Sequence, residues 1–163
     1  MKKKNISNSE SYIRMYTQMA RIRAFEDQAN KLYLSAKMPG LTHMYSGQEA
    51  VAVGICEALK TTDHITSTHR GHGHCVAKGA EFKQMFCELL GKEEGYCRGK
   101  GGSMHIADQE NGNLGANAIV GGSAGIATGA ALSAKNLNRD DVTVCFFGDG
   151  ALGQGLLYEV MNM

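Results

Sequence analysis

The stretch VTVCFFGDG, residues 142–150, decides the fold of this 163-residue chain. Residues 142–147 form an unbroken apolar run of β-forming residues, which is typical of a strand buried on both faces of a parallel sheet. A GDG turn follows at once, and residues 152–163 are again helical in character. Strand, glycine turn and helix form the βα unit of a doubly wound α/β fold, so we expect a mostly parallel sheet with flanking helices.

Hydrophobic periodicity places the other elements along the chain. Ser7 and Glu10 have capping-box spacing, and the apolar residues that follow at helical spacing predict one amphipathic helix over residues 9–36. The patterns further predict a helix over 48–59, a strand over 65–68, a helix over 81–90, a long loop over 91–115 and a helix over 124–137.

The chain shows no internal domain boundary. We expect a single domain over residues 1–163, with a flexible tail over residues 1–9. Because the sequence stops inside a predicted helix, without a glycine or proline stop signal, we expect the domain to be incomplete at its C-terminus, after the GDG strand, turn and helix.

Composition excludes several classes of protein. With 17 Lys and Arg against 16 Asp and Glu, the net charge of +1 creates no long-range field for nucleic acid or an anionic membrane surface. The 5 cysteines are odd in number and form no C-x-x-C pair, which argues against a disulfide framework and favours a reducing compartment, the cytoplasm. Polar residues follow Lys2–Lys4 where a secretory signal needs an apolar stretch, and no later segment reaches the length of a membrane span.

Glycine is abundant and proline almost absent. The chain holds 21 glycines and 1 proline, so its glycines mark tight turns and close contacts rather than a disordered linker. Gly121, Gly125 and Gly129 recur every four residues, which places them along one face of a helical segment. Such a face lets another backbone come close.

The GDG turn is the strongest local signal for a ligand site. A carboxylate flanked by glycines at the carboxyl end of a buried strand lies where open α/β sheets bind ligands. The following helix offers free N–H groups to a diphosphate, and Asp149 can hold a hard cation such as Mg²⁺. One carboxylate leaves the other ligand positions to the diphosphate, water and further residues. Alternatively, Asp149 caps the helix, because Asp is a favoured N-cap residue.

A second candidate site is HRGHGH, residues 69–74, directly after a predicted strand. Zinc binding is a poor interpretation, because histidines at every second position without a further well-spaced ligand do not make a structural zinc site. Arg70 suits bidentate contact with phosphate, and His72 can move protons at neutral pH. His74 has an equally simple structural interpretation as a packed, hydrogen-bonded residue at the start of a helix.

Five strings in this order resemble the alpha subunits of thiamine-diphosphate-dependent 2-oxo-acid and acetoin dehydrogenases. They are HMYSGQEA at 43–50, HRGHGH at 69–74, GKGGSMH at 99–105, IVG at 119–121 and GDG at 148–150. The resemblance extends from Tyr12 to Met163 and implies the thiamine-diphosphate-binding fold. The forms STHRGHGH, GKGGSMHIAD and LGAN are more similar to the acetoin branch than to the pyruvate branch.

The resemblance also implies roles for individual residues. Asp149 matches the Mg²⁺ ligand, and Gly148, Gly150 and Ala151 match the turn whose backbone contacts the diphosphate. His69 and Arg70 match the pair that contacts the diphosphate from the other side, and Ala118 and Val120 match positions that hold the aminopyrimidine ring. His43 and His72 match catalytic histidines that face the thiazolium and the substrate. Lys100–His105 match the loop along the active-site channel. Many relatives have tyrosine in place of His69 and glycine in place of Ala118.

The function implied by the resemblance is that of an acetoin dehydrogenase alpha subunit. Such a subunit binds thiamine diphosphate through Mg²⁺ and passes an acyl or hydroxyalkyl unit to the lipoyl group of an acyltransferase partner. A beta subunit supplies the glutamate that activates the cofactor, so this chain alone is expected to be inactive. The family's Asn-Asn pair and later loop histidine, which complete the site, do not occur in this sequence.

Three other functions are alternatives to this one. A pyruvate or branched-chain 2-oxo-acid dehydrogenase alpha subunit keeps the mechanism and changes the substrate. A non-catalytic assembly module is favoured by the glycine face and the missing second metal ligand. A nucleotide-binding α/β protein is disfavoured, because neither G-x-G-x-x-G after the first strand nor a Walker lysine motif is present.

Overall fold

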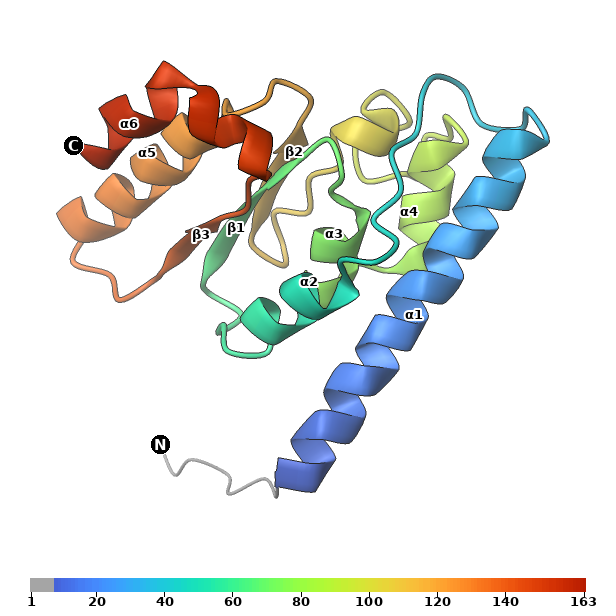
Figure 1. The fold of residues 1–163 in the computed structure, drawn as a ribbon, viewed down its shortest axis with the longest axis horizontal. Helices are drawn as coiled ribbons and strands as arrows, with labels where there is room; N and C mark the ends of the chain where they lie inside the picture. The colour runs from blue at the N-terminus through green and yellow to red at the C-terminus, as the bar shows by residue number, and fades with distance from the viewer. Residues whose placement is uncertain (1–7) are drawn as a thin grey trace.

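The computed structural model describes residues 8–163, in which helices and strands alternate along the chain (Figure 1). The elements are α1 (Asn8–Leu34), α2 (Glu49–Cys56), β1 (His64–Thr68), α3 (His72–Lys78), α4 (Phe82–Leu89), the 3₁₀ helix η1 (Gly102–Met104), β2 (Asn113–Asn117), α5 (Ser123–Asn136), β3 (Thr143–Cys145), the 3₁₀ helix η2 (Asp149–Gly153) and α6 (Gly155–Met161).

The three strands form one parallel sheet in the order β2-β1-β3. In the central strand β1, Ile65 pairs with Asn113 of β2 on one side and with Val144 of β3 on the other. Figure 1 shows α5 and α6 on one side of the sheet and α1 to α4 on the other. These observations confirm the predicted α/β fold with a parallel sheet and flanking helices.

The hydrophobic core lies where α1, α2, α3 and α4 meet. In α1, Ile22, Phe25 and Ala29 are buried at helical spacing, as the sequence pattern predicts. The first half of α1 extends beyond the other elements in Figure 1, and Tyr12 and Tyr16 there are exposed. The long amphipathic helix is therefore confirmed, and its fully buried face belongs to its second half.

The sequence patterns miss two elements. α3 begins within HRGHGH, where glycines weaken the local helix signal. Gly73 is required by packing, because an added Cβ would lie 2.0 Å from Tyr45 Cδ1. β2 begins at Asn113, inside the loop predicted over residues 91–115. Its sequence NLGAN has little β propensity, so pairing with β1 decides its conformation.

The predicted βα unit differs in detail from the observed one. β3 is shorter than the strand predicted over residues 142–147, and its residues are half-buried rather than buried, because β3 lies at the edge of the sheet in the described part of the chain. The helix predicted over residues 152–163 is divided, since η2 ends at Gly153 and α6 begins at Gly155.

Two of the three glycines, Gly125 and Gly129, lie on α5 and have open space around them within residues 8–163. Apart from chain neighbours and the helix's own backbone, no atom lies within 4 Å of an ideal Cβ at either position, whereas an added Cβ at Gly121, before α5, would lie 3.1 Å from Gln154 Cγ. The close approach of another backbone to this face stays a prediction. Residues 1–7, with Ser7 of the predicted capping box and most of the predicted tail, lie outside the described residues, and α1 begins at Asn8.

Candidate functional site

A cavity of about 320 Å³ opens where the three strands end. β1 leads into its lining residues His69 and Arg70, β3 leads into residues 146–151, and the turn after β2 adds residues 120 and 121. Open α/β sheets bind ligands at this position. Among the predicted cofactor-binding residues, the cavity brings together His69, Arg70, Val120, Gly148, Asp149, Gly150 and Ala151.

An aromatic wall forms one part of the cavity. His74 stacks on Phe146, with ring centroids 3.9 Å apart, and meets Tyr45 edge to face. Its Nδ1 lies 2.7 Å from Ser67 Oγ and its Nε2 lies 3.0 Å from the Tyr45 hydroxyl. Burial lowers the pKa of His74 to about 3, so the ring is neutral at physiological pH. The structural interpretation of His74 as a packed, hydrogen-bonded residue is thus confirmed.

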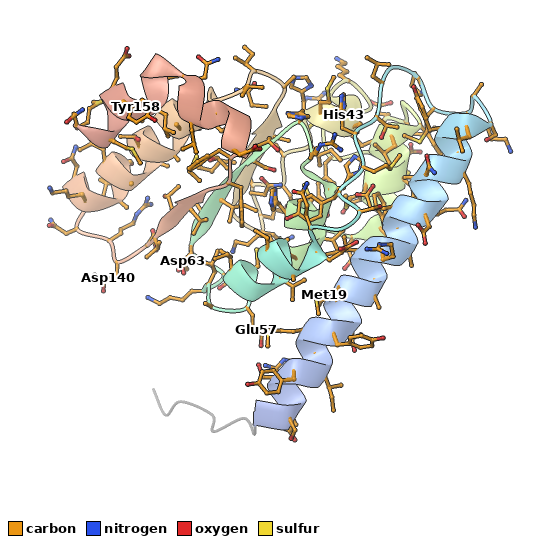
Figure 2. The ribbon with its side chains drawn as sticks, viewed as in Figure 1. Met19, His43, Glu57, Asp63, Asp140 and Tyr158 are labelled. Carbon is orange, nitrogen blue, oxygen red and sulfur yellow. The ribbon has the colours of Figure 1, made fainter. Side chains whose placement is uncertain are left out.

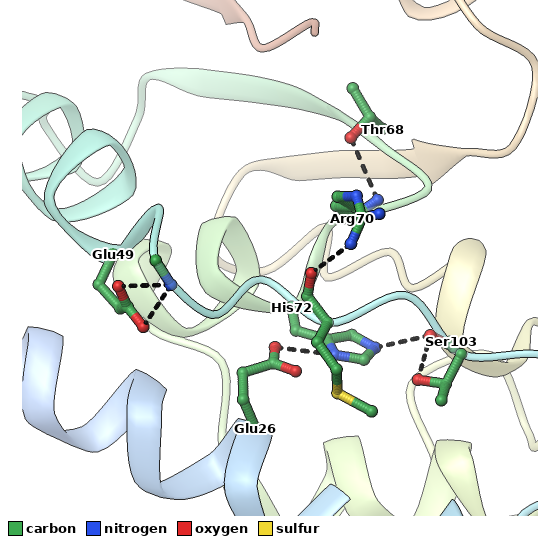
Figure 3. A network of polar contacts seen from close by, with 9 residues as sticks. Glu26, Glu49, Thr68, Arg70, His72 and Ser103 are labelled. Atoms are coloured by element: carbon green, nitrogen blue, oxygen red, sulfur yellow. Dashed lines mark hydrogen bonds and ion pairs between the residues drawn. The ribbon is translucent and has the colours of Figure 1, made fainter. Parts of the chain in front are cut away.

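Arg70 supplies positive charge to the cavity. Its Nη1 donates a 2.7 Å hydrogen bond to the carbonyl of Met44, and its backbone N–H donates to Thr68 Oγ1 (Figure 3). These contacts fix the guanidinium in place. Beside it, burial lowers the pKa of His69, and the nearby His43 and Arg70 lower it further.

Asp149 lines the cavity from the loop that follows β3. It is exposed and is the first residue of η2; the N-cap residue of η2 is Gly148, and no side-chain hydrogen bond caps this helix. The alternative role of Asp149 as a helix cap is therefore wrong. No atom of the described residues lies within 4 Å of an ideal Cβ at Gly148 or Gly150, so the turn leaves its backbone open.

The segment from Thr42 to Glu49 crosses beside the cavity and is held at several points. Glu49 accepts hydrogen bonds from Arg23 Nε at 2.6 Å and, through both oxygens, from the Gly47 N–H at 3.0 and 3.1 Å. The hydrogen bond from Arg23 lowers the pKa of the Glu49 carboxyl, so the carboxyl is ionised at neutral pH. Figure 3 shows Glu49 and Arg70 bound to this same segment.

His43 lies on this segment, on the side of the molecule where the strands end (Figure 2). Its ring meets that of His69 edge to face, with centroids 5.1 Å apart. Its Nδ1 is buried and has no hydrogen-bond partner among the described residues. The structure therefore places His43 next to the cavity-lining residue His69, and its Nδ1 atom lacks a hydrogen-bond partner among the described residues.

His43, His72 and Ala118 are not among the cavity-lining residues. His72 is completely buried, with Nδ1 2.9 Å from Glu26 Oε1 and Nε2 2.9 Å from Ser103 Oγ. Both ring nitrogens are thus occupied by protein partners, as Figure 3 shows. Ala118 is half-buried in the turn after β2. The three histidines of HRGHGH do not converge, because each contacts different neighbours.

Comparison with known proteins identifies the family. The sequence profile of the dehydrogenase E1 component matches residues 17–163. The chain belongs to this family. Membership implies thiamine diphosphate as the cofactor.

Among residues 8–163, no helix is both long and apolar enough to cross a membrane.

Relatives within the family include two acetoin enzymes. The chain is 51% identical over 164 residues to the alpha subunit of acetoin:2,6-dichlorophenolindophenol oxidoreductase of Bacillus subtilis (strain 168), with 100% of this chain and 49% of the relative covered. The subunit of the same name from Cupriavidus necator is 46% identical over 156 residues, covering 96% and 47%. The chain thus spans about half the length of these relatives.

A pyruvate enzyme is a further relative. The chain is 42% identical over 160 residues to the chloroplastic pyruvate dehydrogenase E1 component subunit alpha-3 of Arabidopsis thaliana, with 94% of this chain and 37% of the relative covered. The resemblance seen in the sequence, to E1 alpha subunits and most closely to the acetoin branch, is confirmed.

The residues of this E1 chain suit the family's cofactor. The cavity is lined by a cation, Arg70, and by a carboxylate, Asp149, and the glycines on either side of Asp149 have open space at their Cβ positions. The buried Nδ1 of His43 still needs a hydrogen-bond partner. Residues 8–163 contain no cluster of three or more His, Cys, Asp or Glu side chains that could hold a metal alone, so Asp149 would need ligands from outside this chain segment.

Sequence reasoning missed the aromatic wall. Phe146 and Phe147 both line the cavity and could have been predicted to do so from the sequence. They are the last residues of the apolar run before GDG, and strand ends face the ligand in this fold class. Tyr45 carries no comparable signal. It reaches His74 from a segment 29 positions earlier in the chain, and only packing brings the two rings together.

Proposed function

We propose that this chain is the thiamine-diphosphate-binding part of an acetoin dehydrogenase alpha subunit. The observation that carries the proposal is the single cavity in which Arg70, from the end of β1, faces the GDG turn from the end of β3. The two acetoin relatives, at 51% and 46% identity, support acetoin as the substrate.

Arg70 and Asp149 would bind opposite parts of the cofactor diphosphate. Arg70 offers N–H groups in a planar fork that matches phosphate oxygens, and Met44 already fixes its orientation. Asp149 would hold Mg²⁺ against the diphosphate, with the open backbone of Gly148, Gly150 and Ala151 alongside. His69 would contact the diphosphate beside Arg70, and Ala118 and Val120 would border the cofactor's pyrimidine ring.

Thiamine diphosphate, when bound, supplies the carbon nucleophile and electron sink for cleavage next to a carbonyl group. This chain would orient the cofactor and hold protons near the substrate. His43 would act beside the cavity, where its ring meets that of His69, and a hydrogen-bond partner for its buried Nδ1 atom would have to come from outside the described residues. His72 would act through Ser103 rather than at the substrate, since both of its ring nitrogens are engaged.

A beta subunit and a lipoyl-bearing acyltransferase are the proposed partners, and an acyl or hydroxyalkyl unit would pass to the lipoyl group. Pyruvate or a branched-chain 2-oxo acid is the alternative substrate, supported by the 42% identity to a pyruvate dehydrogenase subunit. A non-catalytic assembly role is the second alternative, which the open face at Gly125 and Gly129 would suit, whereas the convergence of the cavity residues favours cofactor binding.

Dye reduction by the complete assembly tests the proposal. The full-length alpha subunit is co-expressed with its beta subunit, and reduction of dichlorophenolindophenol is measured with acetoin and with pyruvate. Turnover with acetoin that requires both thiamine diphosphate and Mg²⁺ is the expected result. Preference for pyruvate would assign the alternative substrate. Cofactor-independent turnover, or none with any ketone or 2-oxo acid, would refute the proposal.

A further inference from the structure

Glu88 is a fully buried carboxylate outside the cavity. α4 turns Glu88 inward together with Met85 and Leu89, and its side chain is completely inaccessible. An unpaired charge in such a position is strongly destabilising. No lysine, arginine or histidine of residues 8–163 forms an ion pair with it.

Four backbone N–H groups of one loop surround this carboxylate instead. Oε2 accepts hydrogen bonds from Cys97 at 2.7 Å and Gly99 at 2.9 Å. Oε1 accepts from Gly101 at 2.7 Å and Gly102 at 3.0 Å. A carboxylate has about four lone-pair sites, so its capacity is filled. The loop of residues 97–102 is therefore wrapped around Glu88, which explains how the charge is stabilised.

The glycines of the loop permit this close wrapping. At Gly95, an added Cβ would lie 2.5 Å from the Glu88 backbone, and at Gly99 it would lie 2.4 Å from the carbonyl carbon of Gly91. Gly99 also has a φ of +70°, a conformation that L side chains rarely adopt. Within RGKGG, Gly99 is thus explained by its approach to Gly91 and its positive φ, Gly101 by the His105 carbonyl 2.8 Å from an added Cβ, and Gly102 by a φ of +61°.

The loop leads directly to the segment beside the cavity. Ser103, the next residue, lies 2.9 Å from His72 Nε2 and 3.1 Å from Thr42 Oγ1. Thr42 precedes His43, whose ring contacts that of His69. We propose that Glu88 is a positioning residue: by fixing residues 97–102 it sets Ser103, and through Ser103 and Thr42 it holds His43 at the cavity. This inference rests on the proposed function for the role of His43.

Glu88→Gln is the decisive change, because it keeps the shape of the side chain and removes one pair of acceptor sites. The amide N–H₂ would then oppose two backbone N–H donors. Hydrogen–deuterium exchange in the assembled dehydrogenase should rise about tenfold in the peptide covering residues 95–103, and also in the peptide covering residues 41–48. Glu93→Gln, an exposed site on the same connection, should leave both peptides unchanged.

Kinetics supply the second readout. Glu88→Gln should lower kcat about 10- to 100-fold, because small displacements of a catalytic group are costly, while the affinity for thiamine diphosphate stays within about twofold. A merely structural role would lower cofactor affinity and kcat together. Ser103→Ala should give the same loss of kcat and the same rise in exchange at residues 41–48, with normal exchange in residues 95–103, and it tests the link from the loop to His43 if Glu88→Gln does not fold.

Wild-type exchange at residues 41–48 in Glu88→Gln, or wild-type kcat in Ser103→Ala, would overturn the inference. The proposed function fails separately, if the wild-type assembly shows no cofactor-dependent turnover. The exchange measurement then still reports whether Glu88 positions residues 41–48, since it requires neither cofactor nor substrate.

Discussion

Glu26 Oε1 lies 2.9 Å from Nδ1 of His72, and both side chains are completely buried. Ser103 Oγ lies 2.9 Å from Nε2, the other ring nitrogen of His72. Three segments that are distant in the sequence therefore meet in one hydrogen-bonded network (Figure 3). The second oxygen of Glu26 has no hydrogen-bond partner among the described residues. A carboxylate in this position is stabilised by few contacts, which makes the network sensitive to the loss of any one of them.

Glu26→Gln tests this network. The substitution keeps the side-chain volume and removes the charge that faces His72, so we expect the free energy of unfolding to fall by about 1–3 kcal/mol. Urea denaturation followed by circular dichroism measures the change. Asp27→Asn, on the exposed face of the same helix, is the matched control and should change stability by less than about 0.5 kcal/mol. Equal stability of the two variants would show that the pair contributes little.

Asp149→Asn tests the metal assignment. Loss of one charged ligand should weaken Mg²⁺-dependent binding of thiamine diphosphate by about 10- to 100-fold in the full-length assembly, as calorimetric titration can measure. Asp140→Asn is the control, because Asp140 is exposed in the connection between α5 and β3, far from His43 (Figure 2). If Asp149→Asn binds the cofactor as tightly as Asp140→Asn, the metal is held elsewhere.

His74 predicts a pH dependence of stability. Because burial lowers its pKa in the folded chain to about 3, from about 6.5 in the unfolded chain, the unfolded state binds a proton first as pH falls. Its stabilising contribution is complete above about pH 6.5 and is lost between about pH 6.5 and 3.

The slope of stability against pH provides the measurement. In that window His74 should contribute up to about 1.4 kcal/mol per pH unit, and His74→Gln should reduce the slope whatever its effect on stability at neutral pH. The slope is the useful quantity, since the substitution also removes the ring that stacks on Phe146. An unchanged slope in His74→Gln would contradict burial of a neutral ring.

Asp63 predicts a second, more acidic transition. Its Oδ1 accepts from the Val142 N–H at 2.8 Å and its Oδ2 from the Lys60 N–H at 2.7 Å, which joins the starts of β1 and β3. The Val142 hydrogen bond is the main cause of the lowered pKa of this carboxyl. Its contribution is therefore present above the unfolded value of about 3.9 and is lost as pH falls through the lower, folded pKa.

Asp63→Asn should destabilise the chain by about 1–2 kcal/mol at pH 7, because an amide can accept at one atom only. The difference from the wild type should shrink below about pH 4. Cofactor affinity should not change, since Asp63 and His43 lie at opposite ends of the sheet in Figure 2. A difference that persists at pH 2 would contradict the role of the charge.

Local sequence features predicted much of the fold. The apolar run before GDG predicted a parallel strand at the right place, and the helical spacing of Ile22, Phe25 and Ala29 predicted the buried face of α1. Both signals are local, because strand and helix periodicities are read within a few residues. The same holds for Asp149, which follows its strand directly and was predicted to face a ligand cavity.

Elements with weak local signals could not be predicted in this way. α3 forms around Gly73 and β2 from NLGAN because their neighbours supply the packing and the backbone partners. His72 illustrates the limit at the site. Its residue type and its place after a strand predicted a catalytic histidine, whereas the fold buries it between Glu26 and Ser103.

By itself, the sequence determined the α/β class, the GDG turn and the family, because each depends on residues that are close together or on strings in a recognisable order. Tertiary structure decided which polar side chains meet. Glu26 and Ser103 reach the same imidazole from positions 46 and 31 residues away. Contacts over such separations depend on how the helices pack around the sheet, and no local pattern of residues encodes that packing.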